Sequence, residues 1–62
     1  MFNEERYDYI ISKLKKDERV SVSELSNELD ISEVTIRKDL SYLEKENFLK
    51  RTHGGAILSD RH

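Results

Sequence analysis

The sequence predicts a small, mainly α-helical domain with a β-hairpin near its C-terminal end. Apolar residues recur with helical spacing in three segments, at residues 7–14, 25–29 and 36–43. Two strand-like runs surround His53-Gly54-Gly55. The expected order is helix, strand, helix, turn, helix and hairpin, with one domain over residues 1–58 and a linker or frayed end over residues 59–62.

The first helix is expected to start at Asn3, a favourable N-cap residue. Glu4 and Glu5 fall in its first turn, where the helix dipole favours acids, and Phe2 can pack on Tyr7 as a hydrophobic staple. Its apolar residues lie at i, i+3, i+4 and i+7 and form one face, which we assign to the core. They are Tyr7, Ile10, Ile11 and Leu14.

A short strand and a second helix are predicted next. Residues 20–22 alternate and are β-branched at both ends, which is typical of a strand. Ser23 is expected to cap a helix of about two turns that buries Leu25 and Leu29. Asp30 and a buried Ile31 then make a turn so short that the flanking helices must cross steeply, as in a helix-turn-helix. Because this turn lacks glycine, Asp30 or a neighbour is expected to accept an unusual backbone conformation.

The third helix is expected to be capped by Ser32 and to end near Glu46, with Asn47 as a left-handed C-cap residue. Its core face is formed by Ile36, Leu40 and Leu43. The opposite face is polar, basic and small, as suits a groove of DNA, although a solvated face is the simpler interpretation of this helix alone. The candidate DNA-binding residues here are Ser32, Val34, Thr35, Arg37, Lys38, Ser41 and Tyr42.

The hairpin completes the layout of a winged helix-turn-helix, with three helices and one wing. Gly54 and Gly55 are expected to supply the positive φ angles of its turn. Lys50, Arg51 and His53 place positive or protonatable groups on the wing. Arg51, His53 and Gly54 are therefore further candidate DNA-binding residues, and Leu49 at the start of the hairpin is assigned to the core.

The composition narrows the class of protein. A chain of 62 residues buries a modest core, and without cysteine it has neither disulfides nor a zinc–thiolate site. The sequence shows no membrane span and no signal peptide, so we expect a cytoplasmic protein. Its net charge is −2, but the second half, residues 31–62, carries +1. This asymmetry predicts modest, salt-sensitive DNA affinity.

Four segments resemble those of a known family. They are residues 20–25 (VSVSEL), residues 31–40 (ISEVTIRKDL), Leu43-Glu44 and residues 49–56 (LKRTHGGA). Together they resemble the N-terminal DNA-binding domain of the DeoR family, which consists of bacterial repressors of sugar and nucleoside catabolism. The resemblance covers most of the chain, and one departure is Asn47, where the family usually has glycine.

The resemblance implies a sequence-specific DNA-binding domain of a transcriptional repressor, with double-stranded operator DNA as its partner. It implies that the third helix enters the major groove, with Arg37 reading base or phosphate, and that Arg51 and His53 contact the backbone or a minor groove. Family members join this domain to a larger C-terminal domain that binds a phosphorylated sugar or related effector. We expect the present chain to be a fragment, with effector binding and homo-oligomerisation residing in that missing domain.

Two other classes of function compete with this interpretation of the sequence. A winged helix used as a protein-interaction module is the alternative, and the negative net charge and the acidic first half support it. For an enzyme, the two histidines, His53 and His62, lack a cysteine or carboxylate cluster with metal-ligand spacing, and the serines are explained as helix caps. We therefore expect no catalysis, no cofactor and no metal site.

Overall fold

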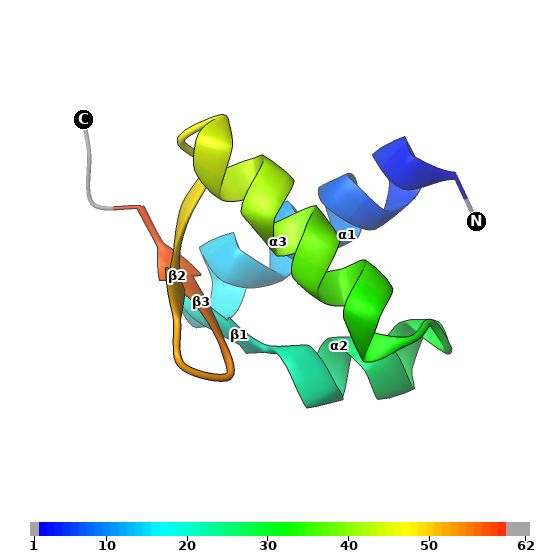
Figure 1. The fold of residues 1–62 in the computed structure, drawn as a ribbon. Helices are drawn as coiled ribbons and strands as arrows, with labels where there is room; N and C mark the ends of the chain where they lie inside the picture. Colours follow the sequence, from blue (N-terminus) through cyan, green and yellow to red (C-terminus); the bar gives the residue numbers. More distant parts are fainter. Residues whose placement is uncertain (1, 60–62) are drawn as a thin grey trace.

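The protein folds as a winged helix-turn-helix, as the sequence predicts. A computed structural model describes residues 2–59, so the predicted linker at 59–62 lies, apart from Ser59, outside the described residues. The element order is α1 (Asn3–Asp17), β1 (Arg19–Ser21), α2 (Val22–Leu29), α3 (Glu33–Lys45), β2 (Leu49–Thr52) and β3 (Gly55–Leu58). Helix α3 crosses in front of α1, α2 lies below its N-terminal end, and the β2–β3 hairpin lies beside it (Figure 1).

The three strands form one antiparallel sheet in the order β1-β3-β2. Strand β3 pairs with β1 through Val20 and Ala56, and with β2 through Arg51 and Ala56. The strand and the hairpin that the sequence predicts separately are therefore joined, and the hairpin is attached to the body of the domain along the whole of β1.

The core lies between the three helices and the inner face of the sheet. It contains residues from all six elements: Ile10, Leu14, Val20, Val22, Leu25, Ile36, Leu40, Leu43, Leu49 and Ala56. Val20, Val22 and Ala56 are core residues that the sequence does not predict. Val20 pairs with Ala56 between β1 and β3, and Val22 is buried at the start of α2. Conversely Tyr7, Ile11, Leu29 and Ile31, expected as core residues, are only partly buried and pack against its edge.

The predicted first cap is wrong by one residue. Phe2, not Asn3, is the N-cap of α1, and its backbone N–H donates to Glu5 Oε1 at 3.1 Å. The Asn3 side chain instead accepts a hydrogen bond from Arg6, so it is not available to cap the helix. Phe2 is 74% exposed, so it does not bury the surface expected of a hydrophobic staple on Tyr7.

The predicted cap of the second helix is also wrong, by two residues. Ser21, not Ser23, is the N-cap of α2, and its Oγ accepts from the backbone N–H of Glu24 at 3.3 Å. Val22 is therefore the first residue of this helix rather than the last of the strand, and its side chain is buried. The strand therefore ends at Ser21, one residue earlier than predicted.

The connections agree more closely with the expectations. Asp30, between α2 and α3, has the left-handed backbone expected there (φ 55°, ψ 47°), and Asn47 after α3 has φ 70°. Gly54 supplies a positive φ of 84° in the hairpin turn, but Gly55 does not and is the first residue of β3. Gly55 serves close packing instead, because a Cβ there would lie 2.1 Å from the carbonyl oxygen of Val20.

Candidate nucleic-acid interface

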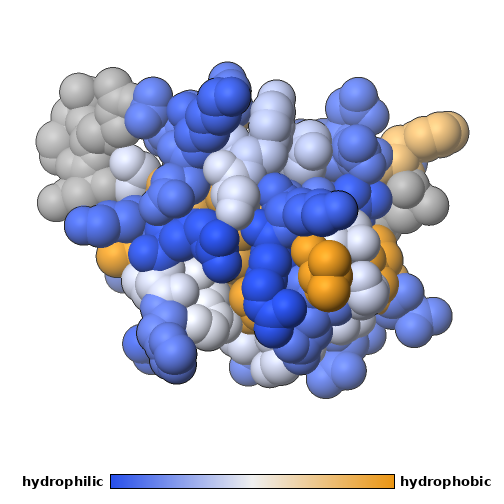
Figure 2. Space-filling view, in the orientation of Figure 1, coloured by the Kyte–Doolittle hydropathy of each residue, from blue (hydrophilic) through white to orange (hydrophobic). Residues whose placement is uncertain are grey.

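The outer face of α3 presents the side chains that the sequence assigned to DNA. With 3.6 residues per turn, Val34, Lys38 and Ser41 lie opposite the buried Ile36 and Leu40. All three are exposed, and Val34 is 59% exposed. The face that Figure 2 shows is largely hydrophilic, with hydrophobic atoms confined to small patches. This face therefore offers donors and isolated methyl groups without an extended apolar surface.

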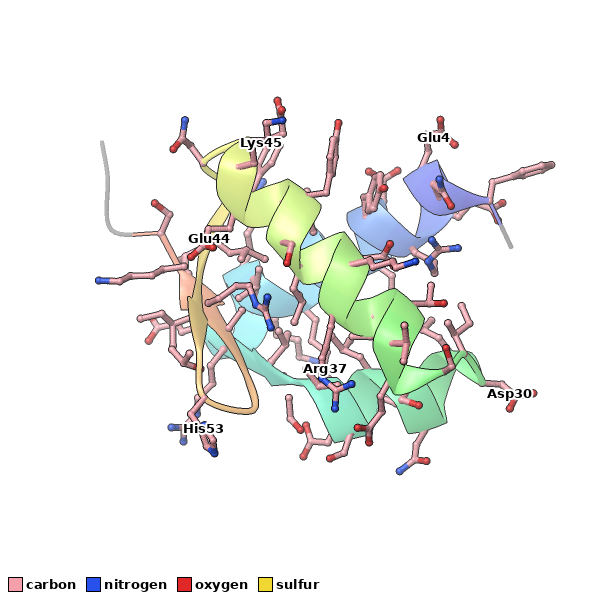
Figure 3. The ribbon with its side chains drawn as sticks, in the orientation of Figure 1. Glu4, Asp30, Arg37, Glu44, Lys45 and His53 are labelled. Atoms are coloured by element: carbon pink, nitrogen blue, oxygen red, sulfur yellow. The ribbon has the colours of Figure 1, made fainter. Side chains whose placement is uncertain are left out.

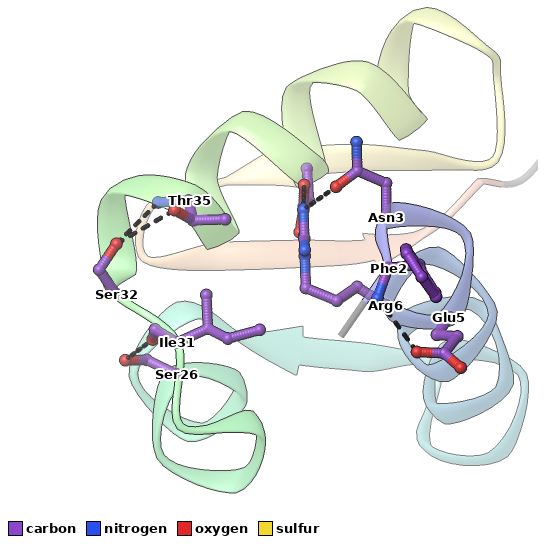
Figure 4. A network of polar contacts seen from close by, with 9 residues as sticks. Phe2, Asn3, Glu5, Arg6, Ser26, Ile31, Ser32 and Thr35 are labelled. Carbon is purple, nitrogen blue, oxygen red and sulfur yellow. Dashed lines mark hydrogen bonds and ion pairs between the residues drawn. The ribbon is translucent and has the colours of Figure 1, made fainter.

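Ser32 and Thr35 are engaged with each other at the start of this helix. The Ser32 Oγ accepts from the backbone N–H of Thr35 at 3.3 Å and donates to its Oγ1 at 3.2 Å (Figure 4). The predicted N-cap is thus confirmed. Because the two hydroxyl groups bond to one another, the structural role of Ser32 and Thr35 is to fix the start of α3.

Arg37 forms an ion pair along the helix with Glu33. Its Nη2 lies 2.9 Å from Glu33 Oε1, in an i,i+4 arrangement. The side chains are 50% and 45% exposed, so the pair borders solvent. Figure 3 shows Arg37 extending from α3 toward the side of the molecule on which His53 marks the hairpin tip.

Tyr42 lies on the other flank of the helix. Its ring stacks on that of Tyr7 in α1, with centroids 4.8 Å apart. At 100° per residue, Tyr42 and Arg37 point about 140° apart around α3. The structure thus brings Arg37 toward the hairpin and Tyr42 toward α1, so the predicted set of residues spans two sides of the helix.

The hairpin is fixed to α3 by Arg51. The Arg51 Nη1 donates to Ser41 Oγ at 2.8 Å, and the Arg51 backbone N–H donates to Glu44 Oε2 at 2.9 Å. On its other side the turn is attached to α2, because the Val22 N–H donates to the Gly54 carbonyl oxygen at 2.9 Å. The wing therefore has a set position relative to the outer face of α3, whereas Lys50 and His53 remain exposed on it.

A buried ion pair behind this face was missed by the sequence analysis. Arg6 Nε lies 2.6 Å from Asp39 Oδ2, and Arg6 Nη2 donates to Asp39 Oδ1 at 3.0 Å. Arg6 Nη2 also donates to Asn3 Oδ1 at 2.8 Å (Figure 4). The two side chains of the pair are only 10% and 4% exposed. The hydrogen bond with Asp39 raises the pKa of Arg6, whose guanidinium is in any case a cation at physiological pH. The sequence does indicate such a pair. Asp39 falls on the same helical face as Ile36 and Leu43, and an acid buried on that face needs a partner.

A hollow of about 590 Å³ lies away from the outer face of α3. It is lined where α1 and β3 end and β1 begins, namely by Asp17, Glu18, Arg19, Ile57, Leu58 and Ser59. Its charged groups are of both signs, so it does not present the convergent donors that an anionic ligand needs. Among residues 2–59, no three histidine, cysteine, aspartate or glutamate side chains are grouped to hold a metal ion, and no helix is long and apolar enough to cross a membrane.

Comparisons with known proteins agree with this geometry. The chain is 51% identical over 61 residues to the uncharacterized HTH-type transcriptional regulator FruR of Bacillus subtilis, a match that covers 97% of the chain and 24% of the relative. It is 48% identical to the HTH-type transcriptional regulator GolR of Listeria innocua (94% of the chain, 23% of the relative). It is 45% identical to the lactose phosphotransferase system repressor of Lactococcus lactis, with the same coverage. The chain thus spans about a quarter of the length of these curated relatives.

No solved structure gives a significant match. The family model described as the DeoR-like helix-turn-helix domain matches residues 6–62, which include both helices of the helix-turn-helix and the whole hairpin. Because that match covers nearly all of the chain, and because relatives from several bacteria share 40% or more of its residues, the chain belongs to the family of DeoR-like helix-turn-helix domains.

Proposed function

We propose that this chain is the operator-binding part of a bacterial transcriptional repressor of sugar catabolism genes, and not an enzyme. The observation that carries the proposal is the exposed outer face of α3 with a wing attached beside it through Arg51. An exposed second helix of a helix-turn-helix fits the major groove of DNA. Family membership supports this, as do relatives described as a lactose phosphotransferase system repressor and a glycerol-3-phosphate regulon repressor.

The proposed roles follow from the chemistry of each side chain. Arg37 would donate to guanine or phosphate, Lys38 to phosphate, and the methyl groups of Val34 would contact thymine methyls. Arg51 and His53 would bind the sugar–phosphate backbone from the wing. The remaining proposed contacts are Ser32, Thr35, Ser41, Tyr42 and the backbone at Gly54.

The proposal extends to a longer protein. We infer that residues 1–58 act as the DNA-binding domain and residues 59–62 as a linker to an effector-binding part, since the matched relatives are about four times as long. A sugar phosphate would bind that part, where a homo-oligomer would also form. The DNA-binding role would place the protein in the cytoplasm with the chromosome.

The function is tested by selecting duplexes that the 62-residue chain retains from a random pool, and then titrating the selected and scrambled duplexes over a range of salt. We expect a defined consensus, a preference for it over the scrambled duplex, and affinity that falls with salt. Retention of no duplex even at low salt would contradict the proposal and favour the protein-interaction alternative.

Replacement of Arg37 by alanine is expected to weaken operator binding without unfolding the domain. Arg37 is half exposed and packs outside the core, so truncation removes one base or phosphate contact, at a cost of about 1–3 kcal/mol of binding free energy. Titration on the selected duplex, with circular dichroism of the free protein, measures both effects. Lys16→Ala removes an exposed charge from α1 and serves as the control. Equal losses for the two variants would exclude Arg37 from the interface.

Replacement of Arg51 by alanine is expected to weaken binding to all duplexes about equally and to lower the slope of log K against log salt by about one unit. This is the behaviour of a phosphate contact. The matched control is Lys15→Ala, which removes an exposed positive charge from α1, outside the proposed contacts. If Arg51→Ala leaves the slope unchanged, the wing does not bind phosphate through this residue.

A further inference from the structure

The ion pair between Glu33 and Arg37 has a consequence for sequence discrimination. We propose that Glu33 is a positioning residue that holds Arg37 in the orientation for reading DNA, and thereby sets the preference for the operator over other sequences. The inference rests on the proposed function, because it concerns the same surface. An acidic residue at this position would otherwise only weaken DNA binding, since it carries the charge of the phosphates.

The geometry lets the carboxylate remain bound while Arg37 reads a base. Glu33 Oε1 lies 2.9 Å from Nη2, one of the two terminal nitrogens of the guanidinium. A guanidinium has five N–H donors, of which this contact occupies one. Bidentate recognition of guanine needs two donors, so enough remain for the O6 and N7 acceptors. Glu33 and the DNA therefore do not have to compete for Arg37.

Fixing this side chain has two effects on binding. A half-exposed arginine without a partner samples many rotamers and reaches phosphates on any sequence. The pair removes part of that freedom before DNA arrives, which lowers the entropic cost of the one productive orientation. It also withholds Arg37 from phosphates outside that orientation. Both effects enlarge the difference between operator and non-operator DNA.

The position of Glu33 fits this role. It is in the first turn of α3, where the helix dipole favours a negative charge, so holding it there costs the helix nothing. Lys38, the neighbouring cation on the same face, forms no salt bridge within the described part of the chain. Of the two cations, Arg37 is thus the one whose side chain is held in a fixed orientation. This is expected if Arg37 reads a base and Lys38 binds a phosphate.

The test measures the ratio of affinities for the selected duplex and its scrambled version at fixed salt. Glu33→Gln keeps the length of the side chain and removes its charge. We expect this ratio to fall about two- to tenfold, which corresponds to the freedom restored to one long side chain. The ratio should fall mainly because the variant binds the scrambled duplex more tightly. Thermal unfolding of each variant checks that α3 is intact.

Two further variants separate positioning from simple charge repulsion. Glu4→Gln removes the same charge from the first turn of α1, far from Arg37 in Figure 3, and should raise both affinities slightly without changing their ratio. In an Arg37→Ala background, Glu33→Gln should no longer alter the ratio, because no guanidinium is left to position.

The outcomes are distinguishable. A fall in the ratio that requires Arg37 supports the inference. An unchanged ratio, or a fall of equal size in the Arg37→Ala background, overturns it and leaves Glu33 as a charge only. A wild-type chain that prefers no sequence would instead contradict the proposed function, because the ratio would then already be one.

Discussion

Replacing Asp39 by alanine is expected to remove a large share of the free energy of unfolding of the domain. Asp39 is 3% exposed and accepts two hydrogen bonds from Arg6, which lies 33 residues earlier in the chain. Its removal leaves a buried guanidinium without its charged partner, and such a loss costs on the order of 3 kcal/mol or more. A domain of 62 residues has a total stability of only about 3–9 kcal/mol, so the loss removes a large share of it.

Urea unfolding followed by circular dichroism measures this effect. The informative control is the double variant Arg6→Met, Asp39→Leu, which removes both charges and fills the space with apolar groups. Replacing a buried ion pair in this way is often neutral or stabilising, so the double variant should be more stable than Asp39→Ala. If Asp39→Ala were as stable as the wild type, water would already screen the charges of the pair.

Replacing Gly55 by alanine is expected to separate β1 from the hairpin. The added Cβ would lie 2.1 Å from the carbonyl oxygen of Val20 and 3.1 Å from the Cα of Ser21. Both are backbone atoms in the adjacent strand, so no side-chain rotation relieves the contact. Such a forced displacement costs about 1–3 kcal/mol or more and also moves the wing relative to α3. The free energy of unfolding and the operator affinity should therefore fall together.

The neighbouring glycine is the matched control. A Cβ added at Gly54 would have no atom within 4 Å, so alanine there meets only the strain of a positive φ, about 1 kcal/mol. Gly54→Ala should leave the pairing of β1 with β3 intact, as hydrogen exchange of the strand amides would show. Similar losses of stability for both variants would mean that the close approach at Gly55 relaxes easily.

Properties that depend on neighbours within one turn were predictable. Ile36, Leu40 and Leu43 are buried at the spacing expected, and the Ser32 hydroxyl caps α3. Asp30 has the left-handed backbone that a short turn without glycine requires. The two misplaced caps show the limit of such prediction, since Ser21 and Ser23 are equally good caps by type. In the folded chain Ser21 is the cap, and Val22 directly after it is buried.

At the candidate interface, too, local properties were predictable from the sequence and contacts between distant residues were not. The sequence alone determined which side of α3 is apolar and which is polar, because a helix repeats every 3.6 residues and its hydrophobic face must leave water. It also determined the helix-turn-helix and the hairpin, because turn residues act locally. The contacts of Arg51 with Ser41 and of Tyr42 with Tyr7 needed the packed chain.

Only the tertiary structure decided which distant groups meet. It paired Arg6 with Asp39, placed Gly55 against Val20, and set the wing beside α3. Spacing along the chain carries no information about these contacts, because each depends on how helices and strands cross once the core has formed. The sequence by itself therefore determined the elements and their faces, while packing determined how the reading helix and the wing are held together.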